Sequence, residues 1–277
     1  MSNKIVLSLL ALLFLVTLLT IDSCKPKDGG EPTPDSLSVD SLANSPCILL
    51  SERINDVLYR AYEYDSTRQL LRLTEYSGSL TANRITKKYR FDYEKKQLAR
   101  ITETNLTTRD QSFIYEMDYD SDGKLLKIRP FRVFNSGLRA IDTLEVIYND
   151  KNYITELSSV TTGSQKWDYD TAGLGNVKKW SIRLPLATQD STFAEYNTYD
   201  DKTSLYGFSK TIQILRLLNG NAASRRNPLK YTFRGENIES IYQYNPKGVP
   251  TQSILKIKAL SDTTFRETVF TYQLDCK

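Results

Sequence analysis

The sequence repeats a short, degenerate unit. Most copies have two aromatic residues separated by one other residue, then Asp or Asn, a polar turn and apolar residues about three positions apart. The copies are anchored by Tyr64, Tyr93, Tyr119, Tyr148, Tyr169 and Tyr199, which lie 29, 26, 29, 21 and 30 residues apart. A period of two places the aromatic side chains on one face of a strand and the polar ones on the other. Because Asp, Asn and Gly favour turns, each unit is predicted to be a β-hairpin.

Consecutive hairpins predict an all-β fold, an antiparallel meander of roughly 14 to 18 strands of ordinary length. A sheet of that size must curl or close to protect its edge strands. We therefore expect residues 47–277 to form a curled sheet or a half-open or closed barrel. Nothing between Cys47 and Lys277 shows a sustained period of 3.6, the pattern of an amphipathic helix.

The amino terminus has the pattern of an export signal. Lys4 precedes an apolar run from Ile5 to Ile21, which is followed by Ser23 and Cys24. The run is shorter than the roughly 20 residues that span a bilayer as a helix, so a cleaved signal peptide over residues 1–23 fits better. The pattern resembles the signals of bacterial lipoproteins, particularly those of Bacteroidota, and implies a lipid on the Cys24 thiol. The alternative is an ordinary secretory signal with an incidental cysteine.

Residues 24–46 are predicted to be a disordered tether between this signal and the folded domain. They contain several Pro, Gly and Ser residues and no apolar period, so they offer too little hydrophobic surface to offset the entropy of ordering. The all-β domain is expected to begin at Cys47. Because Lys25 replaces the aspartate that typically retains lipoproteins at the inner membrane, we expect a lipid anchor in the outer membrane, on its periplasmic or cell-surface side.

Composition excludes several functional classes. Removing residues 1–23 takes away Lys4 and Asp22, so 36 of 37 basic and 32 of 33 acidic residues remain, too balanced a charge for a nucleic-acid binder. The chain has no histidine, which excludes the serine–histidine–aspartate triad and HExxH zinc sites. No catalytic residue, metal ligand or cofactor is predicted. Hydrolysis of glycans by a pair of carboxylates stays open.

The repeats carry a second resemblance. Residues 119–128, Tyr-Asp-Ser-Asp-Gly-Lys-Leu-Leu-Lys-Ile, resemble the tyrosine–aspartate repeat of large bacterial shell proteins. The late element from Tyr242 to Pro250, with cysteines at the first strand and near the end, is more similar to an uncharacterised family of Bacteroidota lipoproteins. That resemblance implies a porin-like, partly open β-barrel and an envelope location, and it brings no established activity. Since long apolar strands with aromatic girdles are missing, the barrel is not expected to insert into the membrane.

Two cysteines bracket the predicted domain. Cys47 and Cys276 are expected to form a disulfide, because paired thiols are common in exported proteins. The alternative for Cys276 is a small buried residue, since it shares a strand face with Phe270, Tyr272 and Leu274.

Four further residues are candidates for ligand contact. Trp167 and Trp180 flank one turn and are suited to stacking on a sugar, although strand tryptophans more often belong to the core. Arg225 and Arg226 are suited to holding an anion, with a solvated loop as the alternative. Asp118, Asp120, Asp122 and Gly123 match the opening of a calcium loop, but Arg129 replaces the closing glutamate, so a hairpin turn is favoured.

Lipid anchor, tether and aromatic scaffold together favour a non-enzymatic envelope protein that displays a binding surface. Its partners would be the membrane, through the lipid, and an extracellular glycan, peptide or envelope protein. The alternatives are a carboxylate-based glycan hydrolase and a purely structural envelope protein.

Overall fold

The computed structural model describes residues 45–108, 112–134, 136–221, 224–259 and 262–277. The predicted signal peptide, Cys24 and the tether as far as residue 44 lie outside the described residues. Ser45 and Pro46, the last two residues of the expected tether, contact the folded domain. The Arg68 guanidinium donates to the Ser45 carbonyl at 3.0 Å, and the Lys277 N–H donates to the Pro46 carbonyl at 3.1 Å.

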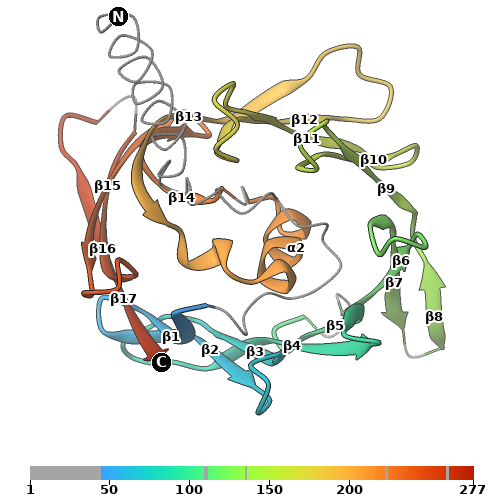
Figure 1. The fold of residues 1–277 in the computed structure, drawn as a ribbon, viewed down its shortest axis with the longest axis horizontal. Helices are drawn as coiled ribbons and strands as arrows, with labels where there is room; N and C mark the ends of the chain where they lie inside the picture. Colours follow the sequence, from blue (N-terminus) through green and yellow to red (C-terminus); the bar gives the residue numbers. More distant parts are fainter. Residues whose placement is uncertain (1–44, 109–111, 135, 222–223, 260–261) are drawn as a thin grey trace, which may run out of the picture. The chain divides into compact units, whose positions relative to one another are not determined.

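The domain is a single antiparallel sheet, as the hairpin repeats predict (Figure 1). Its strands are β1 (Cys47–Ile54), β2 (Val57–Tyr64), β3 (Leu70–Tyr76), β4 (Ile85–Glu94), β5 (Gln97–Asn105), β6 (Phe113–Tyr119), β7 (Leu125–Phe134), β8 (Gly137–Ala140), β9 (Leu144–Tyr148), β10 (Ile154–Ser159), β11 (Gly163–Tyr169), β12 (Val177–Arg183), β13 (Ser191–Thr203), β14 (Arg226–Phe233), β15 (Glu236–Tyr244), β16 (Pro250–Ala259) and β17 (Arg266–Cys276).

The sheet closes on itself, so the all-β prediction is confirmed and its closed form is the one observed. β1 pairs with β2 on one side and with β17 on the other, Cys47 lying opposite Cys276. β7 pairs with β9 as well as β8, so sixteen strands form the ring and β8 is an appendage. All strand pairings fall between Cys47 and Cys276, and residues 47–277 therefore contain a complete barrel without unpaired long edges.

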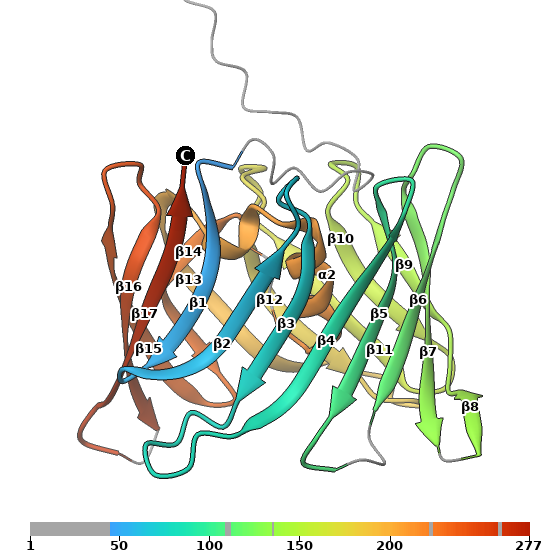
Figure 2. The same cartoon turned by 90° about the horizontal axis from the view of Figure 1, so that it is seen from below.

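The two ends of the barrel differ in the segments that connect the strands (Figure 2). We call the end that holds the start of β1 and the carboxyl terminus the cap end. Its connections are the turns at residues 65–69, 95–96, 120–124, 149–153, 170–176 and 245–249. The opposite end is called the loop end. Its connections are residues 55–56, 77–84, 106–112, 135–136, 160–162, 184–190, 234–235 and 260–265.

In four repeats the Asp or Asn after the second aromatic residue builds a cap-end turn. The Asp120 carboxylate accepts hydrogen bonds from the N–H groups two and four residues later, at 3.0 and 2.8 Å. Asp65, Asn149 and Asn245 make the same pair of contacts in their own turns. A short side-chain acceptor in place of a backbone carbonyl is the reason why Asx residues occupy these positions.

The anchoring tyrosine of each repeat ties that repeat to the preceding one. Its hydroxyl donates to the backbone carbonyl of an apolar residue where the neighbouring strand leaves the cap end, as Tyr93 does to Leu70 at 2.9 Å and Tyr119 to Leu98 at 2.8 Å. The equivalent pairs are Tyr64 with Leu49, Tyr148 with Leu125, Tyr169 with Ile154 and Tyr199 with Val177. We call these six hydrogen bonds the tyrosine latches. They add a side-chain contact at the cap end between paired strands whose chain connection lies at the loop end.

The lumen holds a 3-10 turn, η3 (Leu205–Gly207), and a helix, α2 (Lys210–Leu218), which the sequence did not indicate (Figures 1 and 2). The Ser209 hydroxyl caps α2 by accepting from the Ile212 N–H at 3.2 Å. Side chains on several sides of α2 are buried because the barrel wall surrounds the helix. The apolar face of α2 lies opposite Lys210, Gln213 and Arg216, but a helix of nine residues is too short to show a sustained period of 3.6 in the sequence. Among the described residues, no helix is long and apolar enough to cross a membrane.

The hydrophobic core fills the lumen beside α2. Leu70, Ile101, Leu125 and Val177 are completely buried, and the inward-facing side chains of β2–β13 pack with those of α2. The core faces the lumen because successive side chains along each strand point to opposite faces of the sheet, and the apolar ones point inward.

The outer face is charged. Ion pairs cross the outward sides of neighbouring strands, for example Arg72 with Glu63 at 3.3 Å and Arg100 with Glu116 at 2.8 Å. The series continues with Arg129–Asp118, Lys127–Glu145, Lys230–Glu239 and Lys256–Glu267. Each exposed pair contributes little stability, but together they give the wall a water-compatible surface.

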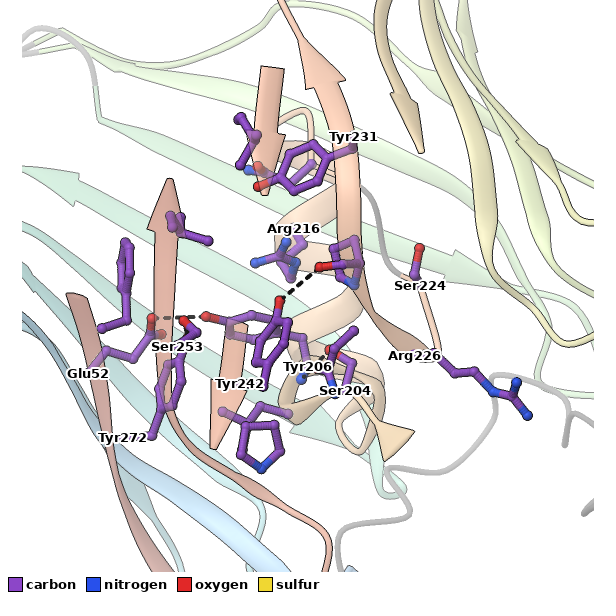
Figure 3. A pocket seen from close by; sticks show the side chains of 18 of the residues that line it. Glu52, Ser204, Tyr206, Arg216, Ser224, Arg226, Tyr231, Tyr242, Ser253 and Tyr272 are labelled. Carbon is purple, nitrogen blue, oxygen red and sulfur yellow. Dashed lines mark hydrogen bonds between the residues drawn. The ribbon is translucent and has the colours of Figure 1, made fainter. Parts of the chain in front are cut away.

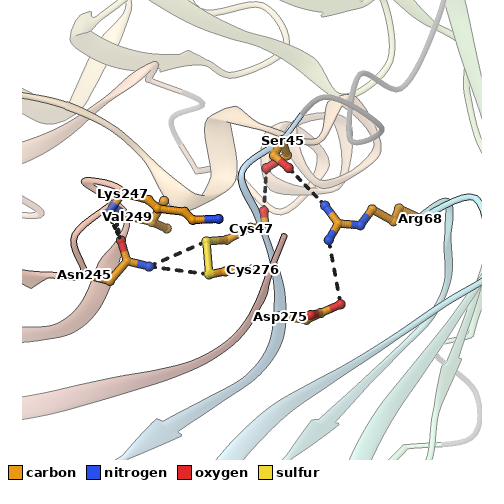
Figure 4. Close-up of a disulfide and its surroundings, with 8 residues drawn as sticks. All are labelled: Ser45, Cys47, Arg68, Asn245, Lys247, Val249, Asp275 and Cys276. Carbon is orange, nitrogen blue, oxygen red and sulfur yellow. Dashed lines mark hydrogen bonds and ion pairs between the residues drawn. A yellow bond between two sulfur atoms is a disulfide. The ribbon is translucent and has the colours of Figure 1, made fainter.

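A disulfide joins the first strand to the last at the cap end (Figure 4). The sulfurs of Cys47 and Cys276 are 2.01 Å apart, and Cys47 is 2% exposed, packed against Leu205 and Val249. The Asn245 side-chain amide lies 3.6 and 3.5 Å from the two sulfurs. The covalent bond therefore lies at the seam where the sheet closes.

Candidate functional site

The lumen contains a cavity of about 370 Å³ bounded by β13–β17, β1, β2, η3 and α2 (Figure 3). Its wall combines aromatic rings with small polar groups and four charged side chains. The lining residues are Tyr59, Tyr196, Tyr206, Tyr231, Phe233, Tyr242, Phe270 and Tyr272; Glu52, Arg60, Arg216 and Arg226; Ser204, Asn221, Ser224, Asn227 and Ser253; and Leu205, Pro228, Ile238, Pro250 and Leu255. A concave, mostly apolar space with a few polar groups is the usual form of a small-molecule site.

Tyrosine rings form one wall of the cavity. Tyr196 and Tyr231 stack with ring centres 5.2 Å apart and an angle of 23° between their planes. The Tyr242 hydroxyl donates to the Pro228 carbonyl at 3.3 Å, and the Tyr272 hydroxyl lies 2.8 Å from the Ser253 hydroxyl. These contacts fix the rings, so the wall is formed before any ligand arrives.

A buried carboxylate lies beside this wall, on the residue that pairs with Tyr272 in the β1–β17 register. Glu52 is 1% exposed and accepts hydrogen bonds from the hydroxyls of Tyr62 and Tyr206, the latter at 2.9 Å. An Arg60 guanidinium nitrogen lies 3.7 Å from the same carboxylate. Arg216, which belongs to α2, places its guanidinium over the Tyr206 ring, 4.1 Å from the ring centre (Figure 3). Positive and negative groups thus face the same space from η3, α2 and β1.

The carboxylate belongs to a belt of charges on the inner faces of β1–β5. Arg60 lies opposite Glu52 and Glu75 in the strand register, and its guanidinium is 2.8 Å from Glu75. Burial acts to lower the pKa of Arg60, but the negative charges of Glu52 and Glu75 outweigh it and raise the pKa well above its ordinary value. Further along, Lys87 pairs with the buried Glu103 at 2.8 Å. Pairing of this kind is what makes buried charges tolerable.

The lumenal tyrosines keep their protons. Burial, followed by the negative charge of Glu52, raises the pKa of Tyr62 and Tyr206 well above the ordinary value. Burial also raises the pKa of Tyr196, to about 12, with the neighbouring Tyr231 adding to the shift. At neutral pH the wall therefore offers neutral hydroxyl groups, suited to hydrogen bonding and not to nucleophilic attack.

Side chains at the two ends of the cavity differ in their burial. At the cap end, Leu205 of η3 and Val249 are buried. Toward the loop end, the rings of Tyr59, Phe233 and Phe270 are partly exposed.

The structure places the two candidate tryptophans in the core. Trp167 and Trp180 lie opposite each other on β11 and β12 and are 1% and 3% exposed. Trp180 packs on Phe193 and Phe233, and a side chain at Gly220 would meet its ring at 3.0 Å. Neither tryptophan lines the cavity or presents a free ring face.

The two candidate arginines are separated. Arg226, the first residue of β14, lines the cavity, and its backbone N–H donates to Asn176 at 3.1 Å. Figure 3 shows its side chain extending away from the tyrosine rings. The Arg225 side chain lies close to Gly175, as does the ring of Tyr153, and Arg225 does not line the cavity. They do not form a joint anion site.

The acidic cluster at residues 118–123 forms a hairpin turn. Asp118 pairs with Arg129 at 2.8 Å, and the Asp120 carboxylate accepts the turn's own N–H groups. Among the described residues, no group of three or more His, Cys, Asp or Glu side chains is arranged to hold a metal ion.

Comparison with known proteins finds no matching family model and no matching curated protein. Among solved structures, the chain is similar to a porin-like protein from Bacteroides uniformis, with a TM-score of 0.48 and 10% identity over 83% of this chain and 96% of that one. It is also similar to a porin-like protein from Bacteroides vulgatus, with a TM-score of 0.37 and 12% identity over 82% and 98% of the two chains. A TcdB2-TccC3-TEV structure matches with a TM-score of 0.34 and 12% identity, over 80% of this chain and 10% of that one.

Proposed function

We propose that this chain is an exported, lipid-anchored envelope protein whose barrel binds a small sugar, such as the end of a glycan, in its lumen. The observation that carries the proposal is the cavity of about 370 Å³ lined by fixed tyrosine rings with Glu52 and Arg216 facing it. A volume in this range suits a mono- or disaccharide better than a folded partner.

The chemistry of the wall favours a sugar over a purely apolar ligand. Sugar rings combine apolar C–H faces, which pack on aromatic rings, with hydroxyls that both donate and accept hydrogen bonds. Tyr196 and Tyr231 supply the rings, and Ser253, Asn227 and Arg216 supply polar groups nearby. A preformed wall also reduces the entropy lost on binding.

Binding is favoured over glycan hydrolysis because the cavity offers one carboxylate. Two-carboxylate glycosidases need a pair of acids roughly 5 to 10 Å apart. Among the described lining residues, Glu52 is the single acidic side chain, and its oxygens are engaged by Tyr62, Tyr206 and Arg60. A general acid or base would first have to break those contacts.

The charged wall supports a barrel that lies outside the bilayer and is held by its lipid. Charged side chains facing lipid at the middle of a membrane cost roughly 2 to 4 kcal/mol each for Arg and Lys. Arg72, Arg100 and Lys230 all project from the outer face. Insertion would require burying many such groups, so anchoring falls to the lipid predicted at Cys24.

Lipid anchoring has a direct test. Mass spectrometry of the membrane-extracted protein is expected to show a mature chain that begins at an acylated Cys24. Cys24→Ala is expected to release the protein from the membrane fraction. An unmodified amino terminus, or a Cys24→Ala chain that stays membrane-bound, would contradict the anchor.

The sugar proposal is tested by screening residues 25–277 on a glycan array while measuring the release of reducing sugar. We expect binding of a restricted set of glycan ends without hydrolysis. Hydrolysis that survives a control for contaminating enzyme would establish the enzymatic alternative. An array without any hit, or binding only of peptides or proteins, would refute the sugar assignment.

A further inference from the structure

Large apolar side chains are exposed at the loop end of the barrel. Leu80 and Val160, at the tips of two different loops, are 84% and 99% exposed. Leu184, Leu186 and Phe265 are also exposed and lie on two further connections at this end, and the exposed Leu138 lies on the short strand β8. We call these six residues the apolar tips. Single exposed apolar residues are ordinary, but their occurrence on four connections and β8 at one end is not explained by the core.

The cap end has no such residues. Among the described parts of its turns, no large apolar side chain is exposed, and Lys95, Lys96, Asp122 and Lys247 are typical of what these turns present. Leu71, Leu126, Ile147 and Ile241 are exposed within strands on the outer wall, Leu106 and Phe134 are exposed at the loop end, and Ile141 follows β8. The difference between the ends is therefore a property of the loop end and not of the composition of turns in general.

Arginines accompany the apolar tips. Arg84 follows Leu80 in the β3–β4 loop, and Arg139 follows Leu138; both are exposed, and neither has an ion pair within the described residues.

We propose that the apolar tips and their arginines dock the loop end on an anionic phospholipid bilayer. The apolar side chains are spread over separate loops around the barrel mouth and form no single groove for a peptide. Figure 2 shows these loops at the same end of the barrel. Shallow insertion of apolar residues with basic side chains at the headgroups is the established mode of interfacial membrane binding.

The predicted lipid anchor is compatible with this orientation. The chain enters the barrel at the cap end, but residues 25–46 could extend over about 75 Å if fully stretched. Strands of ten residues, such as β4, are at most about 35 Å long. The tether is therefore long enough for the loop end to face the membrane that holds the lipid.

The test is co-sedimentation of residues 25–277, which lack the lipid and contain the complete barrel, with phosphatidylcholine vesicles with or without phosphatidylglycerol. The tip variant is Leu80→Ser, Val160→Ser and Leu184→Ser. The matched wall variant is Leu71→Ser, Leu126→Ser and Ile241→Ser, which removes as many exposed apolar side chains elsewhere. Thermal melting verifies that each is folded, and Val160→Ser alone serves if the tip variant is not.

We expect binding to the phosphatidylglycerol vesicles, at least roughly tenfold weaker binding of the tip variant, and unchanged binding of the wall variant. Arg84→Ser with Arg139→Ser should weaken binding to anionic vesicles only. Failure of the wild type to bind either vesicle would overturn the proposal, as would equal losses in the tip and wall variants. Self-association of the lipid-free protein that the tip variant abolishes would assign the surface to a second copy of the chain.

Discussion

Removing the Cys47–Cys276 bond is expected to lower the free energy of unfolding by about 2 to 5 kcal/mol. The bond closes a segment with a sequence separation of 229 residues, so it restricts the unfolded chain strongly. In the folded barrel the same two residues already lie opposite each other on β1 and β17. Chemical denaturation of residues 25–277 with and without the bond measures the difference.

Single and double alanine variants separate the bond from the packing of each cysteine. If the bond is responsible, Cys47→Ala, Cys276→Ala and the double variant lose nearly the same stability, because each removes the same bond. Losses that add up would contradict this account. Thiol labelling of the denatured, non-reduced protein should find neither cysteine free, and two labelled thiols would exclude the bond.

Removing three tyrosine latches together is expected to cost about 3 kcal/mol, since a typical intramolecular hydrogen bond contributes about 1 kcal/mol. The variant is Tyr93→Phe, Tyr119→Phe and Tyr148→Phe, which keeps each ring in the core and removes only the hydroxyl. Their carbonyl partners are Leu70, Leu98 and Leu125. Equilibrium denaturation in urea gives the change in the free energy of unfolding.

Tyr76→Phe and Tyr59→Phe are the matched controls. Within the described residues, neither hydroxyl makes a hydrogen bond. We expect these two substitutions to change stability by less than about 0.5 kcal/mol. If the latch variant is no less stable than the controls, the repeated tyrosine is retained for its ring alone.

The repeat made most of the fold predictable because hairpins are local. Period-two alternation and Asx turns are patterns that lie within about ten residues. Each pair of neighbouring strands could therefore be predicted from its own short stretch of sequence. The reason for the anchoring tyrosine was not visible, because its acceptor lies in another unit, as Leu70 does for Tyr93. Closure of the ring depends on β1 meeting β17, a contact between the two ends of the domain.

The candidate site was less predictable than the fold. Trp167 and Trp180 were singled out by residue type, but an inward-facing strand position at the height of α2 buries them. Tyr231 and Tyr242 were recognised as parts of repeats, and nothing in the local pattern marks which repeats border an empty space. That space exists because α2 fills one side of the lumen, and α2 itself escaped detection. One signal was available, the charged Glu52 that follows the apolar start of the first strand.

The central claim, that ligands bind inside the lumen, is tested most directly by calorimetric titration of the strongest array ligand into paired variants of β15. Tyr242 lines the cavity, whereas its neighbour Ile241 is exposed on the outer wall. Tyr242→Ala is expected to weaken binding at least roughly tenfold and Ile241→Ala to leave it unchanged. If Tyr242→Ala does not fold, it is replaced by Ser253→Val, a change at the lining residue that pairs with Tyr242 in the β15–β16 register. Equal affinities for the wild type and all folded variants would contradict a lumenal site.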